Sequence, residues 1–294
     1  PFSAGAGTSI VERNWIHTLN VSSTAIGSSI NGIHCLLNAE GYLFNNMISL
    51  GNGLAGNLKI IGILQNSMRI FAYHNSIRIV GTDTGTDLSA CYSYTTGGYV
   101  CRTFNNIFYN ERTGTTNNYA FHTLAAITSY QSSHNLFYTS GPAFTMYNNV
   151  AYATLATFSA ATGGQNSPFN TKQLPVVFTS SIDLHTSDLN VRNVGLSPLS
   201  PAVTLDFDNT IRPTCVDIGC DEFDVAIIPG TAFTWLGTIN TQWCQPCNWD
   251  RETLSTTTDD VIIQDNRPFY PWLQPGVGCG DVTVHDFTMQ QNVN

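Results

Sequence analysis

The sequence predicts an all-β fold: a right-handed parallel β-helix with three sheets, followed by a small β-sandwich-like module. The first observation is a short pattern, an Asn followed by an alternating apolar run, that recurs five times in the first half of the chain. The second is that no ten-residue stretch of helical periodicity separates these repeats. Periods of ~20 to ~50 residues are typical of stacked units that bury their apolar faces against each other.

The repeated residues are Asn14, Asn46, Asn75, Asn106 and Asn135, at separations of 32, 29, 31 and 29 residues. Each repeat divides into three short strands rich in β-branched and aromatic residues, bounded by Gly, Asn and Ser. Strands stacked ~4.8 Å apart from one coil to the next would form three parallel sheets around one core.

The repeated Asn falls where the chain turns between the second and third strands of a coil. Asn tolerates a left-handed backbone, and its side-chain amide both donates and accepts hydrogen bonds. In register, each amide can bond to its counterparts in the coils above and below. We therefore interpret the five Asn residues as a structural ladder, with ligand binding as the alternative.

Composition narrows the classes of partner. Only 11% of the 294 residues are charged, and the net charge of −9 argues against nucleic acid or an anionic membrane. No apolar stretch approaches the ~18 residues of a membrane span, and no basic and apolar leader opens the chain. The start at Pro1, close to the first repeat, suggests an excerpted or processed segment.

Eight cysteines in a strand-rich chain with two lysines favour an oxidising compartment. We expect Cys91 and Cys101 to staple the loop between them, and Cys215 and Cys220 are also candidate partners. Cys35 is expected to be a buried free thiol, because two coils separate it from Cys91 and the distance is too long for a disulfide.

Four residues of the tail, Cys244, Cys247, Cys279 and His285, offer the ligands of a tetrahedral zinc site. The expected oxidising compartment and the 31-residue gap before Cys279 (279−247−1) favour a disulfide from Cys244 or Cys247 to Cys279 instead. We therefore predict no metal and no cofactor, with zinc as the weaker alternative.

After Gly141 the repeat loosens. A short helix is expected from Thr154 to Ala161, stopped by Gly163 and Gly164. The coils with "NNMISLG", "HNSIRIVG" and "FNNIFYNERTG" are followed in order by "SIDLH", "SPLSPAV", "DFDNTIRP" and "DIGCDEF". Over residues 8–224 this order resembles the parallel β-helix regions of large cell-surface proteins exported by the type IX secretion system.

The tail from Thr231 resembles the small W-x-G/N-W β modules that follow such regions. The resemblance rests on Trp235-Leu236-Gly237, Trp243, Asn248-Trp249 and the run "DDVII" at 259–263. Strands are expected at 261–263 and 282–284. Residues 1–226 would be the β-helix with its closing segment, and residues 227–294 the module, incomplete at its C-terminal end.

The closing motifs contain six charged residues: Asp206, Asp208, Arg212, Asp217, Asp221 and Glu222. A calcium or sugar site is one interpretation, although the spacing departs from the EF-hand pattern. We favour a structural charge network that closes the last coil and protects its edge strands from pairing with other chains.

One stack on the first strand is the best candidate for a binding surface. If Ile33, Ile63 and Phe121 point inward, alternation turns another set outward on neighbouring coils. That set is His34, Leu64, Tyr92 and His122. Such a ladder can bind sugars, and stacked side chains of this kind also stabilise sheets.

Catalysis is not expected, because a glycoside hydrolase needs two carboxylates ~5–10 Å apart and the acids before residue 150 are scattered. Only the loop pair Asp83 and Asp87 comes close to sharing a position. No Ser-His-Asp arrangement or phosphate loop has the required context. The leading hypothesis is a non-catalytic structural or adhesive rod that presents a binding surface.

Two alternatives stay open: a carbohydrate-binding or polysaccharide-cleaving β-helix (a lyase or glycoside hydrolase), and a subunit of an extracellular filament. The resemblance implies a secreted protein at the outer cell surface. Its partners would be other domains of the same long chain, with a surface polysaccharide or the export machinery as further candidates.

Overall fold

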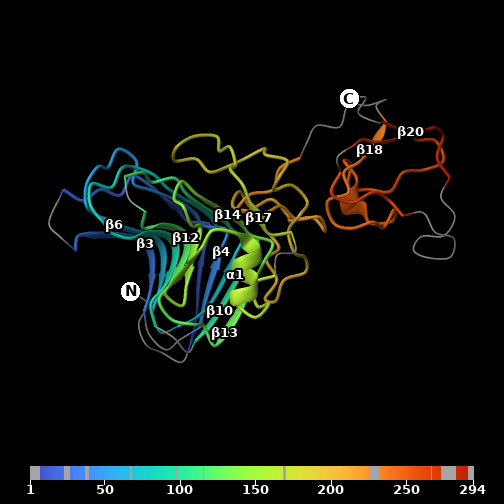
Figure 1. Cartoon of the computed structure of the whole chain (residues 1–294). Helices are drawn as coiled ribbons and strands as arrows, with labels where there is room; N and C mark the ends of the chain where they lie inside the picture. The colour runs from blue at the N-terminus through green and yellow to red at the C-terminus, as the bar shows by residue number, and fades with distance from the viewer. Residues whose placement is uncertain are drawn as a thin grey trace.

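The computed structural model describes residues 7–22, 27–36, 40–66, 68–96, 99–114, 116–167, 170–224, 232–265, 267–272 and 283–290. The main body is a parallel β-helix in which three sheets enclose one core, as predicted (Figure 1). A small separate sheet lies toward the C-terminus.

Each of the first five coils contributes one strand to each sheet, and β16 and β17 are added at the C-terminal end. The first sheet contains, in spatial order, β1 (Thr8–Glu12), β4 (Glu40–Phe44), β7 (Arg69–Tyr73), β10 (Val100–Phe104) and β13 (Ser129–Ser133). The second contains β2 (Trp15–Ile16), β5 (Met47–Leu50), β8 (Ser76–Ile79), β11 (Ile107–Asn110), β14 (Leu136–Thr139) and β17 (Lys172–Gln173). The third contains β3 (Ser29–Cys35), β6 (Lys59–Gln65), β9 (Ser89–Tyr94), β12 (Asn118–Thr123), β15 (Thr145–Tyr147) and β16 (Val150–Tyr152).

The core is built from columns of stacked side chains. Ile33, Ile63, Tyr92 and Phe121 occupy one register position in four successive coils, and all four are buried. The rings of Tyr92 and Phe121 stack with centroids 5.5 Å apart. Burying one large apolar side chain contributes roughly 1.5–3 kcal/mol, so these columns are a main source of stability.

The Asn ladder forms at the corner between the first and second sheets. Nδ2 and the backbone N–H of Asn46 both donate to Oδ1 of Asn75, and the same pair of bonds joins each of the other neighbours. All these bonds point from the earlier coil to the later one. Asn46, Asn75, Asn106 and Asn135 are fully buried, whereas Asn14 is exposed at the N-terminal end.

The residue before each ladder Asn makes the sharp turn. Arg13, Asn45, His74, Asn105 and His134 have φ between 52° and 59°, the left-handed region. We call these five residues the corner column. At each corner, the side chain of the ladder Asn lies on the inside of the rod and bonds to the next coil. The side chain of the residue before it faces the outside.

The C-terminal end of the rod is closed by β16 and α1 (Leu155–Ala161). β16 pairs antiparallel to β15, unlike the other strands. The hydroxyl of Thr154 caps α1 by accepting from Thr157 N, and Gly163 and Gly164 with positive φ follow the helix, as expected from the sequence. Phe158 of α1 is fully buried against the end of the core.

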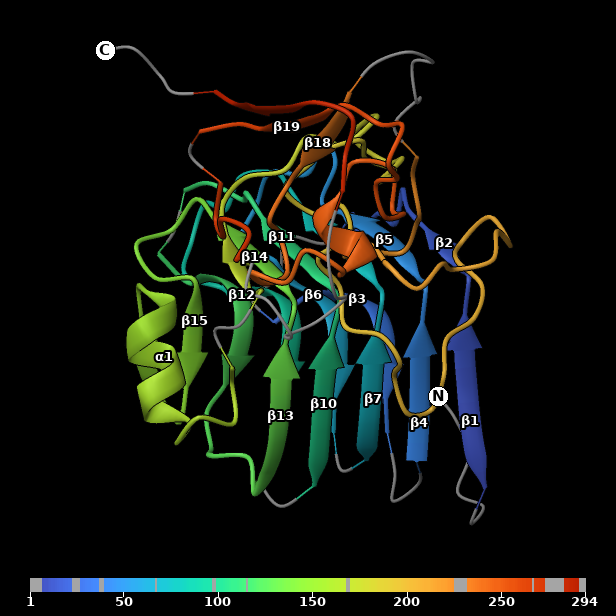
Figure 2. The ribbon, with the colours of Figure 1, turned by 90° about the vertical axis from the view of Figure 1, so that its right-hand side faces the viewer.

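Residues 174–224, which we call the strap, do not close the far end of the rod as predicted, but run along its outside (Figure 2). Phe178 packs edge-on against Tyr109, and the carbonyl of Ile182 accepts from Nε1 of Trp15 on the first coil. The strap therefore crosses the second sheet nearly from end to end. The prediction was wrong because β16 and α1 already protect that end.

The C-terminal module contains β18 (Phe233–Trp235), β19 (Val261–Ile263) and β20 (Phe287–Met289), with a short 3-10 helix, η1 (Pro246–Asn248). Within the described residues its single sheet is parallel, so a second sandwich layer is not seen there. A separate core includes Trp235, Trp243 and Trp249, as expected. The strand expected at 282–284 lies a few residues later, at β20, and Val282 is outside the described residues.

The disulfide pattern differs from the expected one. Cys215 of the strap is bonded to Cys247 of the module. Cys35 is a buried free thiol, as predicted. Cys91, Cys101 and Cys220 are also buried free thiols, so the disulfides expected for them are not formed. Cys91 and Cys101 remain apart because they lie in strands of different sheets; the Sγ of Cys101 bonds to the Tyr92 hydroxyl at 3.5 Å.

Within the part of the chain that the structure describes, no helix is long and apolar enough to cross a membrane.

The Cys215–Cys247 bond closes a loop with a sequence separation of 32. Replacing Cys247 with serine should lower the free energy of unfolding by about 2–4 kcal/mol, because the unfolded chain regains the entropy of the open loop. Chemical denaturation of the variant measures the loss, and mass spectrometry of the unreduced parent should show the linked peptides. Cys220→Ala is the control; an equal loss in both variants would contradict the assignment.

Candidate functional site

The strongest concentration of polar contacts lies where the strap meets the corner column. Asn45 donates from Nδ2 to the carbonyl of Leu205 at 2.7 Å. Nδ2 of Asn105 donates to the carbonyl of Leu196, and Oδ1 of Asn105 accepts from the backbone N–H of Leu196. Successive coils therefore hold the strap at positions set by the coil spacing.

His74 lies between these two contacts and is fully buried. Its Nδ1 faces the carbonyl of Gly219 at 3.2 Å, and its Nε2 faces Nδ2 of Asn105 at 2.9 Å. A neutral ring that donates from Nδ1 and accepts at Nε2 satisfies both partners. Burial, with the nearby charge of Arg212, holds the pKa of His74 well below its usual value, which agrees with the neutral form.

Arg212 is the centre of the strap network, with 1% of its side chain exposed. Its Nη1 pairs with Glu222, and its Nη2 donates to Oδ1 of Asn45 at 2.7 Å and to the carbonyls of Gly219 and Cys220. Burial raises the pKa of Glu222 to about 8, against the opposing charge of Arg212. The guanidinium thus joins the rod to two stretches of the strap.

The carboxylates of Asp206 and Asp217 support turns of the strap. Asp206 accepts from the backbone of Thr210 and of Glu222. Asp217 accepts from the backbone of Asn193 and Phe223, and burial raises its pKa to about 7. These charged groups are thus occupied with internal contacts, the structural role favoured from the sequence, but along the side of the rod and not at its last coil.

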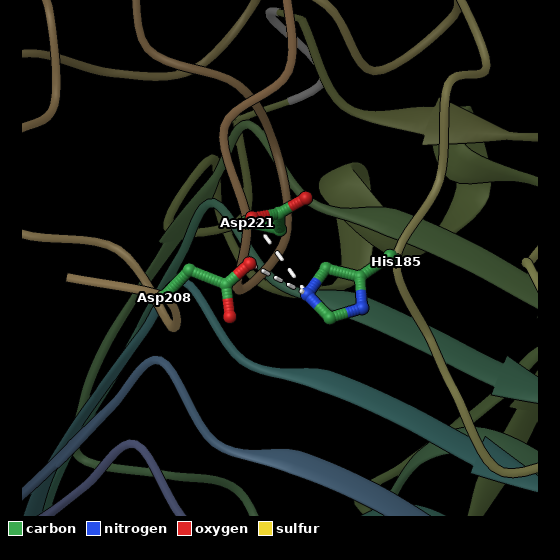
Figure 3. Close-up of side chains that lie close together, drawn as sticks. All are labelled: His185, Asp208 and Asp221. Atoms are coloured by element: carbon green, nitrogen blue, oxygen red, sulfur yellow. Dashed lines mark ion pairs between the residues drawn. The ribbon is translucent and has the colours of Figure 1, made fainter. Parts of the chain in front are cut away.

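His185, Asp208 and Asp221 form one of two groups of potential metal ligands in the described residues, and the less exposed of the two (Figure 3). Nε2 of His185 lies 3.2 Å from Oδ2 of Asp208 and 3.9 Å from Oδ1 of Asp221. Asp183 bonds to Nδ1 on the other side of the ring. Nε2 is buried without a hydrogen-bond partner of good geometry, so it faces the two carboxylates directly.

This arrangement supports two chemical states. With a protonated ring, the group is a charge network that joins the "SIDLH" and "DFDNT" parts of the strap. With a neutral ring, one nitrogen and two carboxylates are ligands suited to a divalent cation, and Asp183 would orient the imidazole. Sequence analysis included Asp208 and Asp221 in its network but missed His185, whose only signal was its place in "SIDLH".

The His185 group should make stability depend on pH. Burial alone would lower the pKa of His185, but the bond to Asp183 and the charges of Asp221, Asp183 and Asp208 raise it above 6.5 overall. The folded state then binds more protons between pH 6.5 and the folded pKa, so stability falls as pH rises through that window. Asp217 and Glu222, with raised pKa values, act in the same direction.

We expect the thermal midpoint to decrease as the pH is raised from 7 to 8.5, and to decrease less in His185→Gln. Thermal denaturation across this range measures both slopes. His17→Gln is the control, because the His17 ring bonds to the neighbouring Thr18 and is not part of the His185 group. A slope that His185→Gln leaves intact would show that His185 does not carry this linkage.

The zinc alternative in the tail is not supported. Cys247 is bonded to Cys215, Cys244 is also disulfide-bonded, and Cys279 lies outside the described residues. His285 pairs instead with Asp260 at 2.7 Å, on an exposed surface that also includes Asp286. The prediction of a disulfide between Cys247 and Cys279 is therefore wrong.

The predicted surface stack is only partly assembled. His34 aligns with Leu64, and His122 aligns with Ser93, which occupies the position assigned to Tyr92. Tyr92 is in the core and has no exposed surface. Leu64 and His122 are also buried, so this column is a packed part of the third sheet.

The loop acids Asp83 and Asp87 do not form an open catalytic pair. The Asp83 side chain is fully buried, 3.7 Å from Nη1 of Arg112. Oδ1 of Asp83 accepts from the backbone of Gly85. Neither carboxylate oxygen of Asp83 is exposed to a polymer in solvent.

No protein-family model matches the chain, and no match was found among curated proteins or solved structures. The class is therefore defined by the fold alone: a parallel β-solenoid with a small separate C-terminal sheet.

Proposed function

We propose that this chain is a non-catalytic structural or adhesive segment of a large secreted cell-surface protein, a rod that spans distance and presents a binding surface. The observation that carries the proposal is the strap network around Arg212. Its charged residues bond to the backbone and to one another. Such contacts hold the strap against the coils, as expected of a rigid structural segment.

The cysteine chemistry supports the location. A disulfide between strap and module is consistent with an oxidising, extracellular compartment. Placement at the outer surface after type IX export rests on the motif resemblance, and so does the expectation that the main partners are other domains of the same chain. A surface polysaccharide and the export machinery are further candidates.

A groove on the first sheet favours carbohydrate binding as the second candidate function. It is a cavity of about 390 Å³ between Ile10, Tyr42 and Phe44 on one side and the strap residues 201–205 on the other. The ring of Tyr42 lies 5.0 Å from that of Phe71, and the rings of Phe44 and Tyr73 stack at 5.5 Å. Aromatic faces beside polar groups suit a sugar better than the buried column of the third sheet does.

A panel of neutral and acidic polysaccharides distinguishes the candidates. The structural proposal predicts no turnover of any member, measured as release of reducing ends or of unsaturated products. If the rod is adhesive through the groove, one polysaccharide should bind, and Tyr42→Ala should weaken that binding at least tenfold while Tyr138→Ala, on the second sheet, leaves it unchanged. Turnover that survives repurification would refute the non-catalytic assignment.

A further inference from the structure

We propose that His185, Asp208 and Asp221 form a binding site for one divalent transition-metal cation, of the Zn²⁺ or Mn²⁺ type, that joins three stretches of the strap (Figure 3). The proposal goes beyond the function above, because neither a structural rod nor carbohydrate binding requires a metal. It rests on how the strap positions the three side chains, on the separations of their ligand atoms and on the partners that these atoms lack.

The backbone of the strap brings the two carboxylates together. The N–H of Phe207 donates to the carbonyl of Cys220 at 2.8 Å, and the next residue of each stretch, Asp208 or Asp221, supplies a ligand atom. Cys220 is itself fixed to the rod, since its N–H donates to Oγ of Ser76 at 3.0 Å. Main-chain contacts therefore position both carboxylates.

The imidazole of His185 is held in one orientation by several contacts. Oδ1 of Asp183 bonds to Nδ1 and also accepts from the backbone N–H of His185. The carbonyl of His185 accepts from the backbone N–H and the hydroxyl of Thr179. The ring packs edge-on against Phe207 with centroids 5.6 Å apart. A carboxylate on Nδ1 favours the tautomer that leaves the lone pair on Nε2, as at metal-bound histidines in general.

The three ligand atoms have separations close to those that a shared cation requires. Nε2 of His185 lies 3.2 Å from Oδ2 of Asp208 and 3.9 Å from Oδ1 of Asp221, and all three atoms lie within 4.8 Å of one another. Zinc bonds of about 2.0–2.2 Å to N and O place neighbouring ligands about 3–3.5 Å apart. The Asp208 side chain is 57% exposed, so water can complete the coordination.

The polar atoms of this group lack the protein partners that other strap carboxylates have. Nε2 of His185 is buried and makes no hydrogen bond. Within the described part of the chain no donor bonds to Asp208 or Asp221, although only 13% of the Asp221 side chain is exposed. Asp206 and Asp217, in contrast, each accept two backbone bonds. Because buried polar groups normally have partners, these atoms point to a ligand.

The charges and donor types select the class of cation. The carboxylates of Asp183, Asp208 and Asp221 surround one imidazole, so the group stays negative even with the protonated ring of the charge network described above. A divalent cation that replaces that proton balances the two ligand carboxylates. One imidazole nitrogen with two carboxylates suits Zn²⁺ or Mn²⁺, whereas Ca²⁺ and Mg²⁺ prefer oxygen ligands.

The second group of potential ligands, Asp260, His285 and Asp286 of the module, provides a matched control. All three residues are exposed, and Nδ1 of His285 is already paired with Oδ1 of Asp260 at 2.7 Å. This group offers the same ligand types without a buried nitrogen that lacks a partner. It therefore tests whether proximity of these residue types is enough to bind a cation.

The test measures binding of Zn²⁺, Mn²⁺ and Ca²⁺ to the chelator-treated chain by isothermal titration calorimetry. We expect one equivalent of Zn²⁺ or Mn²⁺ per chain. His185→Gln, and Asp208→Asn at an exposed position that tolerates substitution, should each weaken this binding at least about tenfold. His285→Gln should leave it unchanged. Circular dichroism of each variant checks that it is folded.

Limited proteolysis gives a second readout, because the cation would join the strap at positions 185, 208 and 221. With Zn²⁺ at about 100 times its Kd, cleavage within 186–220 should slow at least about tenfold in the parent but not in Asp208→Asn. Binding lost in His285→Gln alone would assign the cation to the module. Tighter binding of Ca²⁺ than of Zn²⁺, or no saturable binding below about 1 mM, would overturn the proposal.

Discussion

Replacing Asn106 with leucine should lower the free energy of unfolding by about 3–5 kcal/mol. Oδ1 of Asn106 accepts from both N–H groups of Asn75, and its Nδ2 donates to Asn135 and to the carbonyl of Ala72. Leucine fills the space but leaves several of these buried groups without partners, at about 1–3 kcal/mol each. Urea denaturation at fixed pH measures the loss.

The matched control is Asn14→Leu at the exposed end of the same ladder. Asn14 bonds to Asn46 alone among the ladder residues, and the Asn14 side chain itself is exposed to water. We expect a loss of about 1 kcal/mol or less. Similar losses at both positions would mean that burial in the ladder does not set the energy.

At pH 8.5, Arg212→Met should lower the free energy of unfolding by about 3–5 kcal/mol, because the charged Glu222 is left buried without its counterion. Asn45 and the carbonyls of Gly219 and Cys220 also lose their donor. The strap should then detach before the coils unfold. Limited proteolysis should cut within 196–224 while the strands of the rod stay protected, and denaturation gives the energy.

The double variant Arg212→Met/Glu222→Gln removes the stranded charge and should recover part of the loss. The single variant should also lose less at pH 6 than at pH 8.5, because Glu222 becomes neutral as it takes up a proton. An unchanged proteolysis pattern in Arg212→Met would contradict the role of the guanidinium as the strap's anchor.

Local pattern was enough to predict the rod. The period of the Asn residues and the alternation around Ile33 and Ile63 depend on contacts between neighbouring coils, which repeat along the sequence. The helix after Thr154 could also be predicted from the sequence, because its N-terminal cap and the glycines that end it are local signals. The separate tryptophan core of the module also followed from composition.

The strap could not be placed in this way. The contacts of Asn45 with Leu205 and Arg212 span 160 and 167 residues and follow no repeat. The predicted cysteine pairing was wrong for the same reason, since Cys215 lies in the strap and Cys247 in the module, and no repeat relates the two. The predicted surface stack was wrong at Tyr92, because the residue at that register position is Ser93. A shift of one residue in a strand exchanges its inward and outward faces.

The strap limits how the length of the rod can change. Removing one whole coil between β4 and β11 would keep every sheet in register and every ladder bond intact. It would nevertheless shift Asn105 toward Asn45 by one coil spacing, ~4.8 Å, while Leu196 and Leu205 stay the same number of residues apart. The number of coils between Asn45 and Asn105 is therefore fixed by the strap that bonds to both residues.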